Sequence, residues 1–551
     1  MTDTKTKKID LSRRSFIGHT MVASGVLALG GGLFGASINL ANAAEGSYDY
    51  IICGAGSAGC VLANRLTENG ASVLLIEAGG PDNSEKISTP MRLIELWGTA
   101  YDWGYSTVPQ EHAHGRSLYW PRGKVLGGSS SLNGMIYVRG NASDYDQWAN
   151  EFGCTGWDYD SVLPYFKKSE DFSGGENHYH GVGGLLHVTS EFTPHPVTKA
   201  IVEAAQQAGL AYNHDTNGAS QEGVAFTDLN TRNGKRDSTA VAFLRPALER
   251  KNLALITNAR VHKVEIEKGR AVGVTYMQEG KKQTVTAKKE VIVCGGAIES
   301  PRILMLSGIG PKQELEKLGI AVKVNLPGVG KNLHDHTLCP VIYEGAKEIP
   351  PPTDMSIQIL HGHCFVKSKE SLPGPDMQPL FFHVPYYAPE QEKPTMNAYS
   401  LCAAGVRPTS RGSITLRSSD PEDEMNIDPQ VLQTKNDVDI LVQSIKQMRE
   451  INSQPALDEW RGREIYPGPS VQTDEQLAEY ARSAVLSYHH QNGTCKMGND
   501  AMSVVDPQLR VKGIKGLRVA DASIFPYVMA GNTNAPVIMV AEKAADMIKA
   551  S

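Results

Sequence analysis

Residues 48–80 constrain the fold of this 551-residue chain more than any other segment. An apolar run at residues 50–52 enters a Gly-x-Gly-x-x-Gly turn, a helix-like segment follows, and a second apolar run at residues 73–76 ends at Glu77. This order predicts a strand, a tight turn, a helix and a second strand. We therefore expect an α/β fold with a Rossmann-like sheet that begins near residue 48.

The three glycines of the turn have separate expected roles. Gly54 permits the tight turn, Gly56 lets the backbone approach a pyrophosphate, and Gly59 lets the helix pack closely on the strand. The N-terminus of the helix offers free N–H groups to phosphates, and Glu77 stands where a carboxylate can accept hydrogen bonds from a ribose. A glycine turn can also join an ordinary strand to a helix, but the flanking strands and the terminal acid favour a dinucleotide.

Composition excludes several other classes of protein. The chain is 41% hydrophobic and 21% charged, with a net charge of -6 at pH 7. Such a mildly acidic chain is not suited to nucleic acid or to an anionic membrane surface. The eight cysteines form no C-x-x-C pair, haem-attachment motif or zinc pattern, so we predict neither metal nor haem. A chain of this length is expected to form two domains.

Residues 1–44 have the pattern of an export signal. The run S-R-R-S-F-I at residues 12–17 precedes an uncharged apolar stretch at residues 21–40, and A-N-A at residues 41–43 offers a cleavage site. These features are typical of a twin-arginine signal peptide. A membrane anchor is the alternative, but the stretch is only moderately apolar. We predict cleavage, a periplasmic or secreted protein, and no stable membrane span.

Two later segments also combine apolar strands with glycine. Residues 119–146 contain Gly127 and Gly128 followed by three serines, and their low charge favours a buried cofactor loop over a linker. Residues 291–311 predict a buried strand, a break at Gly295 and Gly296, and a helix. Strand-like runs at residues 253–261 and 271–276 would extend the same sheet.

The end of the chain carries the groups best suited to chemistry. The pair His489 and His490 and an Asn-x-Asn at Asn532 and Asn534 lie in loops between apolar segments. Polar groups held inside apolar walls must find partners or a substrate. The last segment, which ends at residue 548, is expected to be helical, with a periodic pattern at residues 541–548.

These motifs together resemble the glucose-methanol-choline (GMC) family of FAD-dependent alcohol oxidases and dehydrogenases. The resemblance runs from about residue 48 to the C-terminus. Beside the opening unit it rests on G-K-x-L-G-G-S-S-x-L-N at residues 123–133, G-A-x-x-S-P-x-I-L at residues 296–304, GVGKNLHDH at residues 328–336, and the C-terminal pair HQNGTCKMG and GNTNAP.

The resemblance implies a domain organisation. An FAD-binding domain would be assembled from residues 45–172, 231–337 and 485–551. A substrate-binding domain with a mainly antiparallel sheet would comprise residues 173–230 and 338–484. The chain would then be α/β in its FAD-binding part and α+β as a whole.

FAD is the cofactor that the resemblance implies, with Glu77 on the adenosine ribose and the backbone near Val261 at the adenine. Some members attach FAD through a histidine at the position of Leu132, so we predict noncovalent FAD here. The residues predicted to bind the cofactor are Gly54, Gly56, Ser57, Ala58, Gly59, Glu77, Ala78, Gly127, Gly128, Asn133, Gly134, Val261, Asp521 and Asn532.

The family's catalytic histidine falls on His490, and its partner falls on Asn534. An alcohol is a poor hydride donor until its hydroxyl proton leaves, so the imidazole would take that proton before hydride passes to flavin N5. Asn534 would donate to the same oxygen. Many members have a proline after this histidine, whereas Gln491 stands here, so a shift by one residue to His489 stays open. The distance to Gly493 favours His490.

We therefore predict oxidation of a small-molecule alcohol to an aldehyde or ketone, with O2 or a separate electron acceptor reoxidising the FAD. The alternative is a flavoprotein of the same fold without redox activity, such as a hydroxynitrile lyase. Two other features are not assigned a catalytic role. Glu299 is interpreted as a solvated charge at a helix start, and the aromatic run at residues 381–387 suits a substrate wall or a strand core equally.

Overall fold

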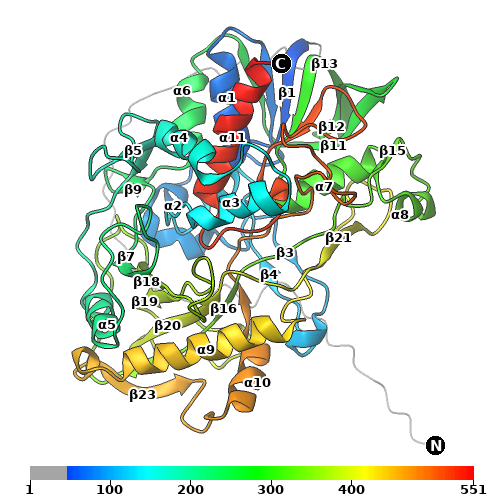
Figure 1. Cartoon of the computed structure of the whole chain (residues 1–551). Coiled ribbons are helices and arrows are strands. Elements are labelled where there is room, and N and C mark those ends of the chain that lie inside the picture. The colour runs from blue at the N-terminus through cyan, green and yellow to red at the C-terminus, as the bar shows by residue number, and fades with distance from the viewer. Residues whose placement is uncertain (1–45) are drawn as a thin grey trace, which may run out of the picture. The chain divides into compact units, whose positions relative to one another are not determined.

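Two sheets organise the part of the chain that the structure describes, residues 46–551 of a computed structural model (Figure 1). The export signal predicted at residues 1–44 lies outside these residues. One sheet is mainly parallel and carries the opening glycine turn. The other is antiparallel and lies in the part of Figure 1 that contains α9.

The first sheet has the order β10-β2-β1-β13-β12-β11, with β25 beside the end of β13. Strands β10, β2, β1, β13 and β25 are parallel, and β12 and β11 continue the sheet antiparallel. The central strands are buried on both faces, which explains their continuous apolar runs. The bounds are β1 (Ser47–Cys53), β2 (Val73–Ile76), β10 (Leu253–Ile256), β11 (Ala259–Glu267), β12 (Arg270–Gln278), β13 (Lys281–Val293) and β25 (Leu517–Val519).

The strand expected at residues 253–261 is two strands. Asn258 adopts a φ of +52° between β10 and β11, and this left-handed turn sends the chain away from β2. Asparagine tolerates this conformation better than most residues. The sequence pattern shows two apolar runs but does not show the turn between them.

Two helices from opposite ends of the chain cover one face of the first sheet. Helix α1 (Ser57–Thr67) follows the glycine turn, and α11 (Asn534–Lys549) packs beside it (Figure 1). Helix α7 (Gly296–Leu306) follows β13, and Ser307 caps its C-terminus. The expected strand, glycine break and helix at residues 291–311 are therefore present.

The second sheet has the order β23-β17-β20-β19-β18-β7, with β16 and β24 joined to β20 through β16. Its pairs are antiparallel, and α9 (Lys435–Asn452) packs on β20. The bounds are β7 (Gly223–Phe226), β16 (Thr337–Cys339), β17 (Ile342–Gly345), β18 (Leu360–Phe365), β19 (Leu380–Phe382), β20 (Ala398–Gly405), β23 (Arg461–Tyr466) and β24 (Leu486–Ser487).

The remaining elements connect and flank the two sheets. The helices are α2 (Glu85–Ser88), α3 (Ala142–Glu151), α4 (Tyr159–Ser169), α5 (Pro196–Gln207), α6 (Arg245–Ala247), α8 (Lys312–Lys317) and α10 (Asp474–Ala484), and η2 (Pro90–Leu96) is a 3₁₀ helix. The short strands are β3 (Tyr105–Ser106), β4 (Tyr119–Trp120), β5 (Glu170–Phe172), β6 (Leu186–Val188), β8 (Thr231–Arg232), β9 (Lys235–Arg236), β14 (Ile309–Gly310), β15 (Val324–Asn325), β21 (Ser413–Leu416) and β22 (Met425–Asp428).

The predicted fold class is confirmed, since a Rossmann-like parallel sheet is joined to an antiparallel sheet. The described residues fall within one compact unit, so the domain boundaries given above stay predictions. Strand β24 is instructive, because it comes from the segment expected in the FAD-binding domain but pairs with β16 of the second sheet. This pairing carries His489 and His490 to the boundary between the two sheets.

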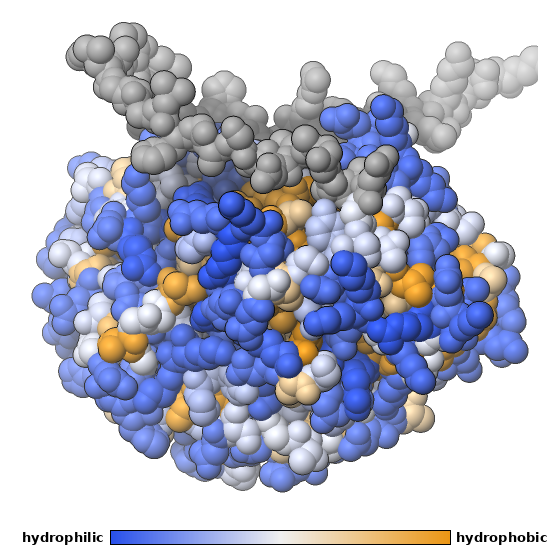
Figure 2. Space-filling view, turned by 90° about the horizontal axis from the view of Figure 1, so that it is seen from above, coloured by the Kyte–Doolittle hydropathy of each residue, from blue (hydrophilic) through white to orange (hydrophobic). Residues whose placement is uncertain are grey.

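The coloured surface in Figure 2 is mostly hydrophilic, and its hydrophobic residues form small separate groups. This agrees with the ordinary charged fraction of the sequence. Between residues 46 and 551, no helix combines the length and the apolar character that a membrane crossing requires.

Candidate active site

The opening turn brings three backbone segments into close contact. Gly54 has a φ of +106°, and a Cβ there would lie 2.6 Å from the carbonyl oxygen of Cys294. A Cβ on Gly59 would lie only 1.9 Å from the carbonyl oxygen of Gly54. Beside Gly56 the space is open, with the Cα of Gly128 at 4.0 Å as the nearest atom. The turn is therefore tightly packed at Gly54 and Gly59 and free for a ligand at Gly56.

Glu77 is held at the end of β2 by two backbone amides. Its Oε2 accepts from the N–H of Ala55 and its Oε1 from the N–H of Gly79, both at 2.8 Å. Burial raises the pKa of this carboxyl to about 7. A carboxylate can accept further hydrogen bonds at each oxygen, and Glu77 lines the cavity described next.

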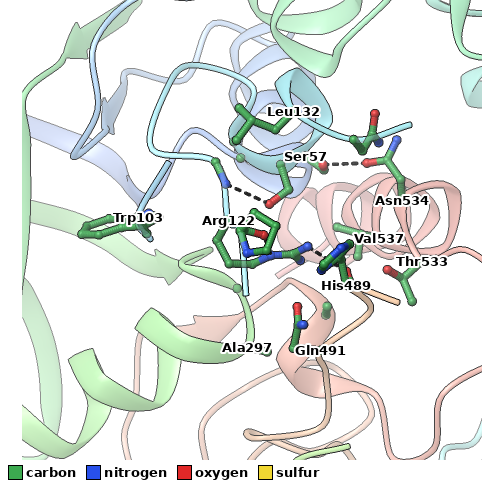
Figure 3. A pocket seen from close by; sticks show the side chains of 18 of the residues that line it. Ser57, Trp103, Arg122, Leu132, Ala297, His489, Gln491, Thr533, Asn534 and Val537 are labelled. Carbon is green, nitrogen blue, oxygen red and sulfur yellow. Dashed lines mark hydrogen bonds between the residues drawn. The ribbon is translucent and has the colours of Figure 1, made fainter. Parts of the chain in front are cut away.

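One cavity of about 300 Å³ extends from the glycine turn to the histidine pair (Figure 3). Gly134 borders it with open space where a Cβ would stand. The predicted residues that line this cavity are Gly54, Gly56, Ser57, Ala58, Glu77, Ala78, Gly128, Asn133, Gly134, Val261, His490, Asp521, Asn532 and Asn534.

Gly59 and Gly127 are the two predicted cofactor residues that do not line the cavity. The carbonyl of Gly54 occupies the space where a Cβ of Gly59 would stand, so the role of Gly59 is close packing within the turn. Gly127 has a φ of +86° and donates its N–H to the carbonyl of Ala55 at 2.8 Å. Both glycines therefore shape the loops that border the cavity.

Asp521 fastens the turn that follows β13. Its Oδ2 accepts from the N–H of Gly296 at 2.8 Å and from the hydroxyl of Ser300 at 2.5 Å, and its Oδ1 accepts from the N–H of Ser523 at 2.8 Å. Burial raises the pKa of this carboxyl. Asp521 thereby joins the C-terminal segment to α7 at the cavity wall.

His490 lies between a second imidazole and an amide. Its Nδ1 is 2.9 Å from Nδ1 of His336, and its Nε2 is 3.2 Å from the Nδ2 of Asn532. The Oδ1 of Asn532 accepts from Nε2 of Gln378 at 3.0 Å, which orients the amide. Because Asn532 presents an N–H group, His490 Nε2 is the acceptor, and the proton of the neutral ring sits on Nδ1 and points to His336.

Asn534 has a different partner from the one expected. It is the first residue of α11, and its Oδ1 accepts from the hydroxyl of Ser57 at 2.7 Å (Figure 3). Asn532, and not Asn534, makes the direct contact with His490, while Asn534 also lines the cavity, so its predicted role as a donor to the substrate oxygen stays a prediction. The two asparagines are two residues apart, and the start of α11 between them points their side chains to different neighbours.

Burial keeps the imidazole of His490 neutral. It lowers the pKa of His490 well below the usual histidine value, and His336, His489 and Arg122 add to the effect. Burial also lowers the pKa of His336 to about 3. At neutral pH both rings are therefore uncharged, and Nε2 of His490 is free to take a proton.

His489 borders the same cavity without a partner for its ring. Its φ is +67°, and its carbonyl accepts from Nη2 of Arg122 at 2.7 Å. The ring meets Trp97 edge to face at 5.2 Å, and neither ring nitrogen has a hydrogen-bond partner among residues 46–551. The two adjacent histidines are thus distinct, because only His490 contacts the amide of Asn532.

His336 and Gln378 are site residues that the sequence did not reveal. His336 belongs to the H-D-H run of the GVGKNLHDH motif, in which alternate residues of an extended chain point to opposite sides. That alternation places His336 against His490, while His334 accepts at Nε2 from the N–H of Val528. Gln378 lies in a variable segment and no motif marks it.

Glu299 is not a solvated charge, so that interpretation is wrong. Its Oε1 accepts from the hydroxyl of Tyr105 at 2.7 Å, and its Oε2 lies 2.8 Å from Nη1 of Arg302. Although burial opposes it, Arg302 and Arg260 hold the pKa of Glu299 below its usual value. The charge is compensated within the protein at the cavity wall.

The aromatic run at residues 381–387 lies partly in the sheet core and partly in the cavity lining. Phe381 is fully buried in the sheet core. Phe382 and Tyr386 line the cavity and stack on each other with ring centroids 4.8 Å apart. The alternation of the strand separates the two roles.

A glycine cradle for a dinucleotide, joined by one cavity to an imidazole and an amide, defines a nucleotide-dependent oxidoreductase site. Family comparison agrees. Models of the GMC oxidoreductase family match residues 48–338 and 408–541. The chain belongs to the GMC oxidoreductase family.

Similar proteins cover nearly the whole chain. Choline dehydrogenase of Homo sapiens mitochondria is 44% identical over 91% of this chain and 90% of its own length. The oxygen-dependent choline dehydrogenase of Chromohalobacter salexigens is 42% identical over 91% of this chain and 95% of its own length. Among solved structures, pyridoxine 4-oxidase from "Mesorbium loti" is 34% identical, with a TM-score of 0.88 over 92% of this chain and all of that chain.

Proposed function

We propose that this protein oxidises an alcohol to an aldehyde or ketone with FAD as the cofactor. The observation that carries the proposal is the contact between His490 Nε2 and the Asn532 amide at one end of the cavity. The glycine turn and Glu77 border the other end. The alcohol would lose one proton and one hydride, two electrons in all, and FAD, when bound, supplies the acceptor for the hydride.

His490 acts first in this proposal. Its neutral ring takes the hydroxyl proton at Nε2, which leaves the alkoxide character that makes the carbon a hydride donor. The proton on Nδ1 stays toward His336, so the contact at 2.9 Å fixes which ring nitrogen is the base. When the alcohol is bound, its hydroxyl would replace the Asn532 N–H as the donor to Nε2, and Asn532 would donate to the substrate oxygen instead. Gln378 holds the oxygen of the Asn532 amide and so keeps its NH2 group on the side of His490.

The residues at the other end fit FAD. Open space beside Gly56 and Gly134 admits a ligand close to the backbone, and the buried Glu77 carboxylate suits a ribose diol. Leu132 lines the cavity with a hydrocarbon side chain that cannot form a bond to the cofactor, which supports noncovalent FAD. Heating or acid treatment followed by filtration should release all of the flavin into the filtrate.

The electron acceptor is O2 or a separate carrier. Two relatives noted above are choline dehydrogenases, one of them described as oxygen-dependent, so choline is a first alcohol to test. Oxygen consumption compared with reduction of an artificial dye under the same conditions separates the two kinds of acceptor.

Export by the twin-arginine route is also proposed, from the S-R-R-S-F-I run at residues 12–17. Replacing both arginines by lysine should keep the protein in the cytoplasmic fraction of the producing cells. Unchanged recovery from the periplasm or medium would contradict this proposal.

Anaerobic mixing of the purified yellow protein with an alcohol tests the proposed function. Bleaching of the flavin absorption together with formation of the matching aldehyde or ketone is expected. A flavin that stays oxidised with every alcohol, or cleavage of a cyanohydrin without bleaching, would favour the non-redox alternative.

A further inference from the structure

The wall of the cavity beside His490 is apolar. Tyr488 stacks on His490 with ring centroids 4.5 Å apart, and it belongs to a buried hydrophobic cluster. Six further members of that cluster also line the cavity, namely Ile136, Leu338, Ile359, Leu360, Leu380 and Phe382. A substrate whose hydroxyl group meets His490 therefore has hydrocarbon around its carbon skeleton.

The carboxylates that line the cavity are all engaged elsewhere. Glu77 accepts from two backbone amides, Asp521 accepts from Gly296, Ser300 and Ser523, and Glu299 is paired with Arg302 and Tyr105. Glu77 directly follows β2, Asp521 follows β25 and Glu299 lies on α7, so all three acids belong to the first sheet and its helices. None of them is available to a cation beside the hydrophobic cluster.

Asp335 contacts the backbone of His490, but its side chain does not line the cavity. Its Oδ1 accepts from the backbone N–H of His490 at 2.7 Å, and its Oδ2 accepts from the Ser487 hydroxyl at 2.5 Å and from Gln491 Nε2 at 3.0 Å. It lies outside the cavity lining, whereas the cationic Arg122 is part of it. The charge that a ligand meets at this end is therefore positive.

The apolar wall reaches the surface. Ile94 on η2 lines the cavity and is 46% exposed, and nearby Met355, whose carbonyl accepts from the N–H of Met91, is 47% exposed. A cavity rim of this kind lets an apolar molecule enter without passing charged groups. Neither Ile94 nor Met355 carries a charge that could pair with a cation.

We propose that the site takes uncharged alcohols with an apolar alkyl or aryl skeleton and discriminates against alcohols that carry a quaternary ammonium group, including choline. This inference rests on the proposed alcohol oxidation. Burying a trimethylammonium group here would cost its hydration with no carboxylate to compensate, whereas a tert-butyl group of the same shape loses nothing polar. Aromatic faces can bind such cations, and Trp97, Phe382, Tyr386 and Tyr488 line the cavity. Tyr386 covers one face of Phe382 and His490 one face of Tyr488, and without a carboxylate the remaining faces compensate the lost hydration only in part.

The test compares choline with its neutral counterpart 3,3-dimethylbutan-1-ol by anaerobic flavin reduction of the holoenzyme. We expect kcat/KM for the neutral alcohol to exceed that for choline on the order of 10²-fold. A linear series from ethanol to octan-1-ol should gain about fourfold in kcat/KM for each buried methylene until the cavity is filled. Preference for choline, or a flat series, would overturn the inference.

Two exposed positions provide matched variants. Ile94→Glu places a carboxylate at the rim of the cavity. It should lower the ratio of kcat/KM for the neutral alcohol to kcat/KM for choline at least about tenfold. Val182→Glu changes an equally exposed residue, 48%, that does not line the cavity, and the ratio should stay as in the parent. An unchanged ratio in Ile94→Glu would contradict the role of the rim.

The outcomes separate the inference from the function on which it rests. If choline alone reduces the flavin, alcohol oxidation stands and the substrate class is wrong. If no alcohol of either kind reduces it, the proposed function fails.

Discussion

The two ends of the cavity are built by different means. The glycine-turn end is made of backbone, with Gly54, Gly56 and Gly59 close in sequence and Glu77 tied to the same turn by amides. The histidine end is made of side chains from distant segments, with His490 meeting His336 and Asn532. A local pattern can specify the first end, whereas the second end depends on how two sheets come together.

This contrast predicts that single glycine substitutions at the glycine-turn end abolish either folding or FAD binding. Gly59→Ala should abolish soluble folded protein, because its Cβ would overlap the carbonyl of Gly54. Gly56→Ala should fold as apoprotein and lose bound FAD, because its Cβ would occupy the open space offered to the ligand. The ratio of flavin to protein and the Tm of the apoprotein measure both effects.

A normal flavin content in Gly56→Ala would contradict the assignment of this turn to the cofactor. A folded Gly59→Ala variant would show that the turn can move to admit a Cβ. The claim that tightly packed backbone builds this end of the cavity would then be weaker.

The histidine end should lose rate without losing cofactor. His490→Ala is expected to lower kcat/KM roughly 10²- to 10⁴-fold, since the proton acceptor is removed. His489→Ala, in the same loop, should cost less than about tenfold, because its ring has no contact with Asn532. Steady-state assays at matched FAD content give both values, and a larger loss in His489→Ala would exchange the two roles.

The two asparagines sharpen the same contrast. Asn532→Leu should lower the rate of flavin reduction roughly 10²- to 10³-fold, because the donor to the substrate oxygen is lost. Asn534→Leu removes the hydrogen bond to Ser57 and should act mainly on Tm, with a loss of rate below about tenfold. Rapid mixing and thermal unfolding of both variants are the measurements.

Equal losses of rate in the two asparagine variants would show that both side chains matter equally for the reaction. The contact of Asn532 with His490 at 3.2 Å would then not identify the donor to the substrate oxygen.

Lowering the pH should have small effects, which differ between the two ends of the cavity: little change in the rate at the histidine end and weaker FAD binding at the glycine-turn end. The pKa of His490 is depressed, so the ring stays neutral as the pH falls from 8 to 6.5, and the rate of flavin reduction should change less than about threefold. The pKa of Glu77 is raised to about 7, so protonation as the pH falls through 7 removes an acceptor for the ribose and should weaken FAD binding several-fold, by about 3- to 10-fold.

FAD titrations at pH 6 and pH 8, with Glu77→Gln as the variant that cannot titrate, measure the second effect. The affinity of Glu77→Gln should not depend on pH in this range. A steep loss of rate centred at pH 6.5 in the parent would contradict a neutral, buried His490.

The sequence was sufficient for the opening strands of the first sheet and for the glycine-turn end, because the required glycines and Glu77 lie within 24 residues of one another. It also indicated His490, since the distance to Gly493 is fixed by the chain. It assigned the partner role to Asn534 and did not indicate the contact of Asn532 with His490, because that contact depends on where α11 begins. His336 and Gln378 are far from His490 in sequence, and only the pairing of β24 with β16 and the second sheet bring them near.

The most direct test is a crystal structure of the FAD-bound protein with an unreactive alcohol analogue in the cavity. The analogue's oxygen should lie within hydrogen-bond distance of His490 Nε2 and of the Asn532 amide, with its carbon skeleton against the hydrophobic cluster. An oxygen bound to His489 or Asn534 instead would contradict the assignment of base and donor.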